Sequence, residues 1–228
     1  MTVLKTDSLK LYKDKLENYI SALPETASES EVIETFFEKS CKYTFEILPS
    51  ASDEGYYLLC RLNVEQNKKR LTFENIDYSN RKASKAIINT QQGVCNVSIS
   101  NDGIYSTNSS YDYSAAYILR GDGQCLAWDN GIMYTFTLDK IANLSSISFF
   151  PSWNRYGTRG NDFKGTRYSK SVRVKVYCDD EEIFNGELSG LVPNDRVYVT
   201  FDKFNQCHLE KINVGSAEAF ANYLKIYI

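Results

Sequence analysis

The sequence predicts a mainly β protein, an antiparallel β-sandwich with a smaller N-terminal part that combines helices and strands. Three observations predict this fold class. Aromatic residues, which favour strands, make up 14% of the 228 residues. Short runs of alternating apolar and polar residues recur through most of the chain. Glycines and other turn-forming residues separate these runs, and no apolar stretch is long enough to predict a membrane-spanning helix.

Two helices are expected at the start of the chain. From residue 9 to residue 20, apolar residues recur at spacings of three and four, as on one face of a helix, and Pro24 follows. A second helix is expected to begin at Ser28 or Ser30 and to end near residue 40. Either serine can cap it, and acidic residues occupy its first turn.

Strand patterns follow at residues 43–48, 56–64 and 71–73 and complete an N-terminal part at residues 1–80. This part holds 10 Lys and Arg against 14 Asp and Glu, whereas residues 81–228 hold 16 against 15. The polar segment 77–84 is the expected boundary between the two parts. We expect residues 1–80 to dock and residues 81–228 to form a β-sandwich binding domain.

The second part is expected to hold short strands and no helix. The strand patterns lie at residues 94–99, 117–119, 134–138, 145–150, 172–178, 183–188, 197–201, 207–214 and 223–228. In the run 172–178, valines alternate with Arg173 and Lys175, so this strand should have one buried face and one wet face. Many short strands separated by turns are typical of a sandwich or a jelly roll.

Several of these segments resemble a known family. Residues 101–107 contain an Asp-Gly…Thr pattern, residues 134–139 an aromatic…Leu-Asp strand, and the strand patterns at 141–150, 172–178, 207–214 and 224–228 follow in order. The order is similar to that of discoidin, or coagulation factor 5/8 type C, domains. These belong to the galactose-binding-like group that includes many carbohydrate-binding modules. The resemblance covers residues 84–228 and implies a jelly-roll β-sandwich.

The resemblance also bears on calcium. Family members often hold a structural Ca²⁺ with the Asp and Thr of the first segment and a carboxylate of the last strand. Asp102 and Thr107 match the first two positions, but Tyr223 stands near where the carboxylate would fall. Asp102 with Gly103 is better explained as a simple turn. We therefore expect no cofactor, with Ca²⁺ at Asp102 and Thr107 as the alternative.

The most informative segment for function is the predicted loop at residues 149–170. From residue 149 to residue 175 there are seven Lys or Arg and one Asp. Aromatic rings can stack on sugars, and planar guanidinium groups suit carboxylates or phosphates. The candidate ligand-binding residues are Trp153, Arg155, Tyr156, Arg159, Arg167 and Tyr168. The alternative is that the apolar residues cap the core and the arginines pair with the acidic N-terminal part.

The sequence offers few residues suited to catalysis. The single histidine, His208, lies in a strand pattern beside Cys207, and neighbouring strand residues face opposite sides of a sheet. The scattered carboxylates single out no pair. The six cysteines occur singly, and we expect them to be reduced and mostly buried thiols. We expect a protein without catalytic activity.

Two functions remain open. The first is a structural or recognition protein of a viral or phage particle, such as a decoration, fibre or tail-type protein, with other assembly proteins as partners and a possible homo-oligomer. The second is a lectin-like carbohydrate-binding module that holds a glycan through the loop at 149–170. The first ten residues lack a signal-peptide pattern, so we expect synthesis in the cytoplasm and a final place in a virion. A net charge of −3 argues against nucleic-acid binding.

Overall fold

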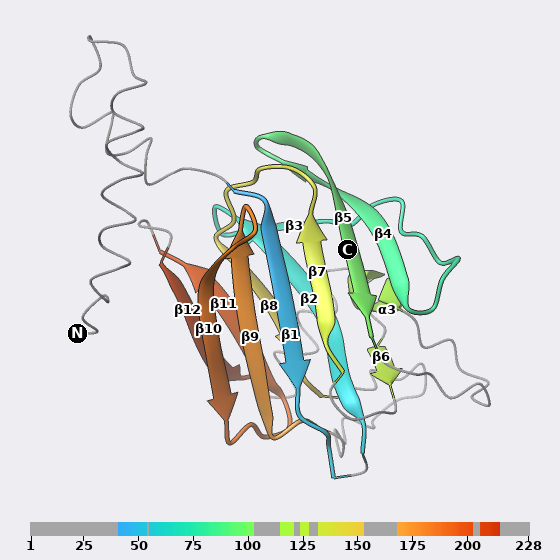
Figure 1. Ribbon diagram of the computed structural model, residues 1–228, viewed down its shortest axis with the longest axis vertical. Helices are drawn as coiled ribbons and strands as arrows, with labels where there is room; N and C mark the ends of the chain where they lie inside the picture. Colours follow the sequence, from blue (N-terminus) through green and yellow to red (C-terminus); the bar gives the residue numbers. More distant parts are fainter. Residues whose placement is uncertain are drawn as a thin grey trace. The chain divides into compact units, whose positions relative to one another are not determined.

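The computed structural model describes residues 41–53, 55–102, 115–120, 124–127, 132–152, 168–202 and 206–214, with the side chains of 124–127 excepted (Figure 1). The helices expected at residues 9–20 and 28–40 and the strand expected at 223–228 lie outside these ranges.

The described chain is mainly β and forms two antiparallel sheets. The first sheet contains, in spatial order, β10 (Glu181–Ser189), β9 (Ser171–Cys178), β1 (Tyr43–Pro49), β7 (Tyr134–Leu138), β5 (Gly93–Asn101) and β4 (Ala83–Thr90), side by side in Figure 1. The second sheet contains β12 (Cys207–Asn213), β11 (Asp195–Phe201), β8 (Ser146–Phe150), β2 (Tyr57–Gln66) and β3 (Lys69–Leu71), and β6 (Gln124–Ala127) also pairs with β2.

One hydrophobic core joins the two sheets. In β1, Tyr43, Phe45 and Ile47 are buried and alternate with half-buried residues, as the sequence pattern predicted. β7 has the same alternation. The second sheet contributes buried apolar side chains from β2, β8 and β11 to the same cluster. Each large apolar side chain buried in this way contributes about 1.5–3 kcal/mol before the entropy of ordering the chain is subtracted.

The expected boundary near residue 80 does not separate the strands. β1 pairs with β7 on one side and with β9 on the other, and β2 pairs with β8. Strands from both sides of residue 80 therefore share both sheets. β4 begins at Ala83, within the segment expected to link two parts. All described residues belong to one compact unit.

The segment 117–119, which we predicted as a strand, lies in a helix instead. Helix α3 (Ala115–Arg120) buries Ala115, Ala116, Ile118 and Leu119. These positions follow the spacing of one helical face, but a short apolar run does not distinguish a helix from a buried strand. Among the described residues, no helix is long and apolar enough to span a membrane.

A disulfide joins Cys41 and Cys178, so the expectation that all six cysteines are reduced is wrong. The Cα atoms are 5.4 Å apart, within the usual range for a disulfide. The pairing of β1 with β9 sets Tyr43 opposite Cys178, which brings Cys41 beside the end of β9. A separation of 137 residues along the chain hid this proximity from the sequence pattern. Cys60, Cys95 and Cys207 are not part of the disulfide.

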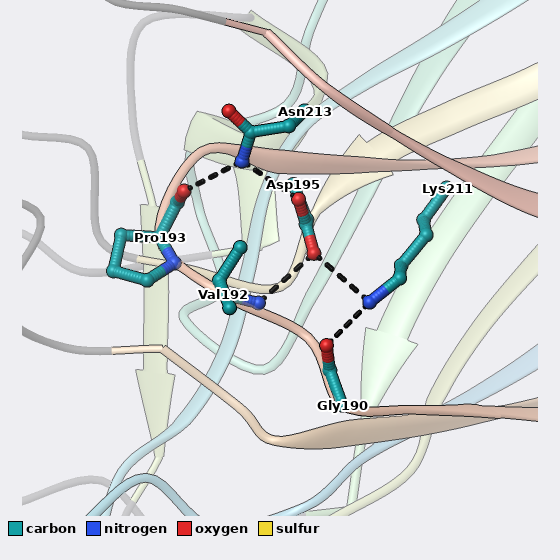
Figure 2. A network of polar contacts seen from close by, with 6 residues as sticks. All are labelled: Gly190, Val192, Pro193, Asp195, Lys211 and Asn213. Carbon is teal, nitrogen blue, oxygen red and sulfur yellow. Dashed lines mark hydrogen bonds and ion pairs between the residues drawn. The ribbon is translucent and has the colours of Figure 1, made fainter.

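A polar network holds β12 to the segment that connects β10 with β11 (Figure 2). The buried Asp195 carboxylate accepts hydrogen bonds from Val192 N at 2.9 Å and from Asn213 Nδ2 at 2.8 Å. It also forms an ion pair with Lys211 Nζ at 3.4 Å, and Lys211 Nζ donates to the Gly190 carbonyl. Because the carboxylate is 3% exposed, these partners replace the water it loses.

Candidate binding surface

The predicted loop site is described only at its two ends. Tyr168 forms an isolated antiparallel bridge with Ser152, and Ser169 N donates a hydrogen bond to the Pro151 carbonyl at 2.8 Å. The remaining candidates, Trp153, Arg155, Tyr156, Arg159 and Arg167, lie outside the described residues. The loop at 149–170 therefore stays a predicted binding site with its two ends side by side.

The end of this loop is anchored to the connection between β1 and β2. Ser50 Oγ accepts hydrogen bonds from the backbone nitrogens of Lys170 and Ser171, each at 3.0 Å. Lys170 Nζ lies 2.5 Å from Asp53 Oδ1, and this neighbouring carboxylate raises the pKa of Lys170. These contacts hold the end of the loop in place, so any ligand-binding residue in the loop would be attached to a fixed base.

Of the two residues expected at the alternative calcium site, the structure describes only Asp102. Asp102 Oδ1 accepts a hydrogen bond from Met133 N at 2.7 Å, which ties the end of β5 to the start of β7. Thr107 lies outside the described residues. Within the ranges that the structure describes, no three His, Cys, Asp or Glu side chains gather as a metal site would require.

His208 and Cys207 do not form a nucleophile–base pair. Burial raises the pKa of the Cys207 thiol to about 12, so the thiol stays protonated at neutral pH. His208 is exposed, and its Nε2 lies 3.3 Å from Asp202 Oδ2. The two residues are consecutive in β12 and face opposite sides of the sheet.

The outer face of the second sheet is buried at its centre. Phe150 is 1% exposed, and Arg61 and Arg196 are each 5% exposed. The Arg196 guanidinium donates from Nε and Nη2 to Ser148 Oγ at 3.1 and 2.9 Å and lies 5.0 Å from the Phe150 ring centroid. The centre of this face therefore offers no open surface to a ligand.

The outer face of the first sheet is open by comparison. Five hydroxyl side chains project from its three neighbouring strands β1, β7 and β5, and all are half-buried; we call them the hydroxyl face, formed by Thr44, Ser98, Ser100, Thr135 and Thr137. The strand register arranges them in two rows. Thr44, Thr137 and Ser98 lie opposite one another in the first row. Thr135 and Ser100 lie opposite one another in the second, and Ser98 Oγ and Thr137 Oγ1 are 2.6 Å apart.

Charged side chains border the hydroxyl face on β1, β9 and β10. Glu46 Oε2 accepts a hydrogen bond from Tyr177 OH at 3.2 Å and lies 3.7 Å from Lys175 Nζ. Farther out, Arg173 Nη2 lies 3.0 Å from Glu187 Oε2. Desolvation and the Glu46 carboxylate raise the pKa of Tyr177, so its hydroxyl remains a donor at neutral pH. The centre of the face is thus uncharged and its border carries paired charges.

Comparisons with protein-family models, with curated proteins and with solved structures find no match for this chain. Its class therefore follows from the fold alone, a mainly β protein of two antiparallel sheets.

The sequence contained part of the signal for the hydroxyl face. Threonines alternate with buried aromatic residues in the strands predicted at 43–48 and 134–138, which indicates that they face outward. These threonines lie beside the serines of β5 because β1, β7 and β5 are neighbours in the sheet. That order depends on pairings between distant segments, which an alternating pattern does not encode.

Proposed function

We propose that this chain is a non-catalytic structural or recognition protein that displays its β domain as a component of a viral or phage particle. A decoration, fibre or tail-type role fits this proposal. The observation that carries it is the difference between the two outer faces. The second sheet buries Arg61, Phe150 and Arg196 on its outer side, whereas the first sheet leaves a wide polar face half-exposed.

The chemistry of the described side chains supports a recognition role. The one histidine is exposed and pairs with Asp202, and the neighbouring thiol is held protonated by burial. The thiol is therefore not poised as a nucleophile. We also propose the galactose-binding-like jelly roll as the finer description of the two sheets, on the strength of the resemblance in residues 84–228.

The disulfide between Cys41 and Cys178 supports a role outside reducing surroundings. Disulfides persist in oxidising environments such as virion surfaces and are rare in the cytosol. A particle component that is synthesised in the cytoplasm and released by lysis would meet such conditions. Other assembly proteins, and copies of the chain itself, are its proposed partners.

A lectin-like function is the second candidate, and two observations favour it. The predicted loop of aromatic and basic residues emerges from a fixed base at Ser152 and Tyr168. The hydroxyl face offers groups that match the hydroxyls of a sugar. In this candidate the glycan is held by Trp153, Arg155, Tyr156, Arg159, Arg167 and Tyr168, as the sequence predicted.

Fractionation of the producing cells separates the two candidates. Particles purified by density gradient are probed with an antibody against this chain, and the soluble fraction is applied to glycan arrays. The particle role predicts that the chain sediments with particles and that deleting residues 1–40 releases it to the soluble fraction. A chain that never sediments with particles and binds a defined glycan would overturn the particle role in favour of the lectin role.

A further inference from the structure

We propose that Cys41 and Cys178 form a redox switch, which closes on the already folded domain when the protein passes from reducing to oxidising surroundings. In the open form both sulfurs are thiols, and in the closed form they share the disulfide. The fold is the same in both forms, but only the closed form holds the start of β1 to β9 through a covalent bond. The switch is independent of whether the chain is a particle component or a lectin.

Backbone hydrogen bonds hold Cys41 beside the end of β9 without help from its sulfur. Cys41 N donates to the Ala142 carbonyl at 3.2 Å, and Ala142 N donates to the Cys41 carbonyl at 3.0 Å. Asp179 N donates to the Lys42 carbonyl, and Asp179 Oδ1 accepts a hydrogen bond from Lys42 N, both at 3.1 Å. These hydrogen bonds do not depend on the disulfide, so they place Cys41 for pairing with Cys178 in either form of the switch.

A tight turn fixes the position of Cys178. This cysteine is the last residue of β9 and lies opposite Glu181, the first residue of β10. Asp179 and Asp180 connect the two strands, and their φ angles are positive, at 51° and 70°. Positive φ at both central residues is typical of a type I′ hairpin turn, which Asp and Asn adopt readily. The distance of 5.4 Å between the Cα atoms of the two cysteines thus follows from the β1–β9 register and from this turn.

The core around β1 is large enough for the domain to fold in the open form. β1 pairs with β9 along its whole length and with β7 on its other side, where the strands lie side by side in Figure 1. Its inward side chains Tyr43, Phe45 and Ile47 are 0–1% exposed. Disulfides are required for folding mainly in small domains that cannot build a sufficient core. A chain that is kept among cytosolic reductants therefore folds first and acquires the bond afterwards.

The closing step is a thiol–disulfide exchange in which a small disulfide, R–S–S–R, is the oxidant. Cys178 is half-buried whereas Cys41 is 3% exposed, so Cys178 reacts first. Its thiolate attacks one sulfur of the oxidant, the S–S bond breaks, and the departing RS⁻ takes up the proton that Cys178 lost. The Cys41 thiolate then attacks the Cys178 sulfur of the mixed disulfide, and the second RS⁻ leaves with the proton of Cys41. Two electrons thus pass from the two cysteines to the oxidant, which becomes two R–SH.

The cysteines outside the pair whose side chains the structure describes compete poorly for the oxidant. Cys60 and Cys95 are 2% and 1% exposed, so a small disulfide does not reach their sulfurs in the folded domain. Burial raises the pKa of the Cys207 thiol to about 12, and the thiolate is the form that reacts. The fold therefore directs oxidation to Cys41 and Cys178.

A redox titration of the full chain tests the switch. The chain is equilibrated with mixtures of reduced and oxidised glutathione, in buffer and in concentrated urea, and the remaining thiols are blocked by alkylation. Peptide mapping under non-reducing conditions then gives the fraction of chains in which Cys41 and Cys178 are linked. This fraction yields the effective concentration of one thiol at the other. Circular dichroism and urea unfolding of the wild-type chain, kept reduced by a dithiol, show whether the open form is folded.

Two substitutions of Asp179 form a matched pair that tests how Cys41 is positioned. Asn and Gly both tolerate the φ of 51° at this position, so neither Asp179→Asn nor Asp179→Gly strains the turn. Asp179→Asn keeps a side-chain oxygen that can accept from Lys42 N, whereas Asp179→Gly removes it.

We expect the open form to have the circular dichroism spectrum of the closed form and to unfold cooperatively in urea. The effective concentration should be on the order of 10³-fold higher in buffer than in urea, because the fold brings together two sulfurs that are far apart in the unfolded chain. Asp179→Gly should lower the value in buffer about threefold to tenfold, as the loss of one hydrogen bond implies, and Asp179→Asn should lower it less.

Three results would overturn the inference. A reduced wild-type chain that is unfolded would show that the bond is needed for folding. Equal effective concentrations in buffer and in urea would show that the fold does not position the two sulfurs. A folded chain that links Cys41 or Cys178 to a different cysteine would remove the pair as the switch. An unchanged value in Asp179→Gly would overturn the positioning assigned to Asp179.

Discussion

Removal of the disulfide should lower the stability of this protein by a large amount. Replacing Cys41 and Cys178 with serine opens a covalent loop that spans 137 residues. In the chain-entropy model, a cross-link of this length restricts the unfolded chain by about 5 kcal/mol. For a protein of this size, 1 kcal/mol corresponds to about 2–4 °C in melting temperature, so Tm should fall by about 10–20 °C.

Thermal unfolding followed by circular dichroism measures this effect. The wild-type chain is compared with Cys41→Ser/Cys178→Ser, each with and without a reducing agent. The reductant should lower the wild-type Tm to that of the double variant and leave the double variant unchanged, which controls for effects on the other thiols. Peptide mapping under non-reducing conditions confirms the link directly. A wild-type Tm that changes by less than about 3 °C on complete reduction would refute the entropic reasoning.

Three further predictions follow from the described contacts. Asp195→Ala should lower the free energy of unfolding in urea by about 2–3 kcal/mol, because it removes from a buried site the carboxylate that Val192 N, Asn213 and Lys211 contact. Asp195→Asn should lower it by less. A loss below about 0.5 kcal/mol for Asp195→Ala would contradict the structural role of the network. Desolvation raises the pKa of Asp139, but hydrogen bonds from the Asn96 side chain and backbone outweigh it and place this pKa below its ordinary value of 3.8. The contribution of Asp139 to stability is therefore present above pH 3.8 and is lost as the pH falls through the lower pKa of the folded state. Asp139→Asn should flatten the acid side of a plot of Tm against pH. An unchanged acid side would contradict this role of Asp139. At pH 8 the Cys207 thiolate fraction should be on the order of 10³-fold smaller than that of free cysteine, and iodoacetamide should label Cys207 slowly until the protein is unfolded; labelling as fast as free cysteine would show that the thiol is not buried.

The alternating strands could be predicted because their two faces differ sharply. In β1 and β7, aromatic and aliphatic residues alternate with Thr and Glu, and the structure confirms that the apolar set is buried. β4 was missed because its inward positions include the small or polar residues Ser84 and Ala86, so its alternation is weak. Helix α3 was taken for a strand because its apolar run is too short to define a period.

Features that depend on distant pairings could not be predicted in this way. The disulfide joins positions that only the pairing of β1 with β9 brings together. The hydroxyl face likewise requires β1, β7 and β5 to be neighbours, although they are far apart in the sequence. The predicted loop site depended on local composition alone, and the structure adds only that its ends meet at Ser152 and Tyr168.

The position of the disulfide also has a mechanical consequence. Cys41 lies two residues before the start of β1, and its sulfur is bonded to the last residue of β9. A pulling force that reaches the domain from residues 1–40 is therefore shared between two neighbouring strands through a covalent bond. β1 cannot be unzipped from β9 one hydrogen bond at a time from this end. A domain tethered through its N-terminal segment would keep β1 paired with β9 under tension until the disulfide is reduced.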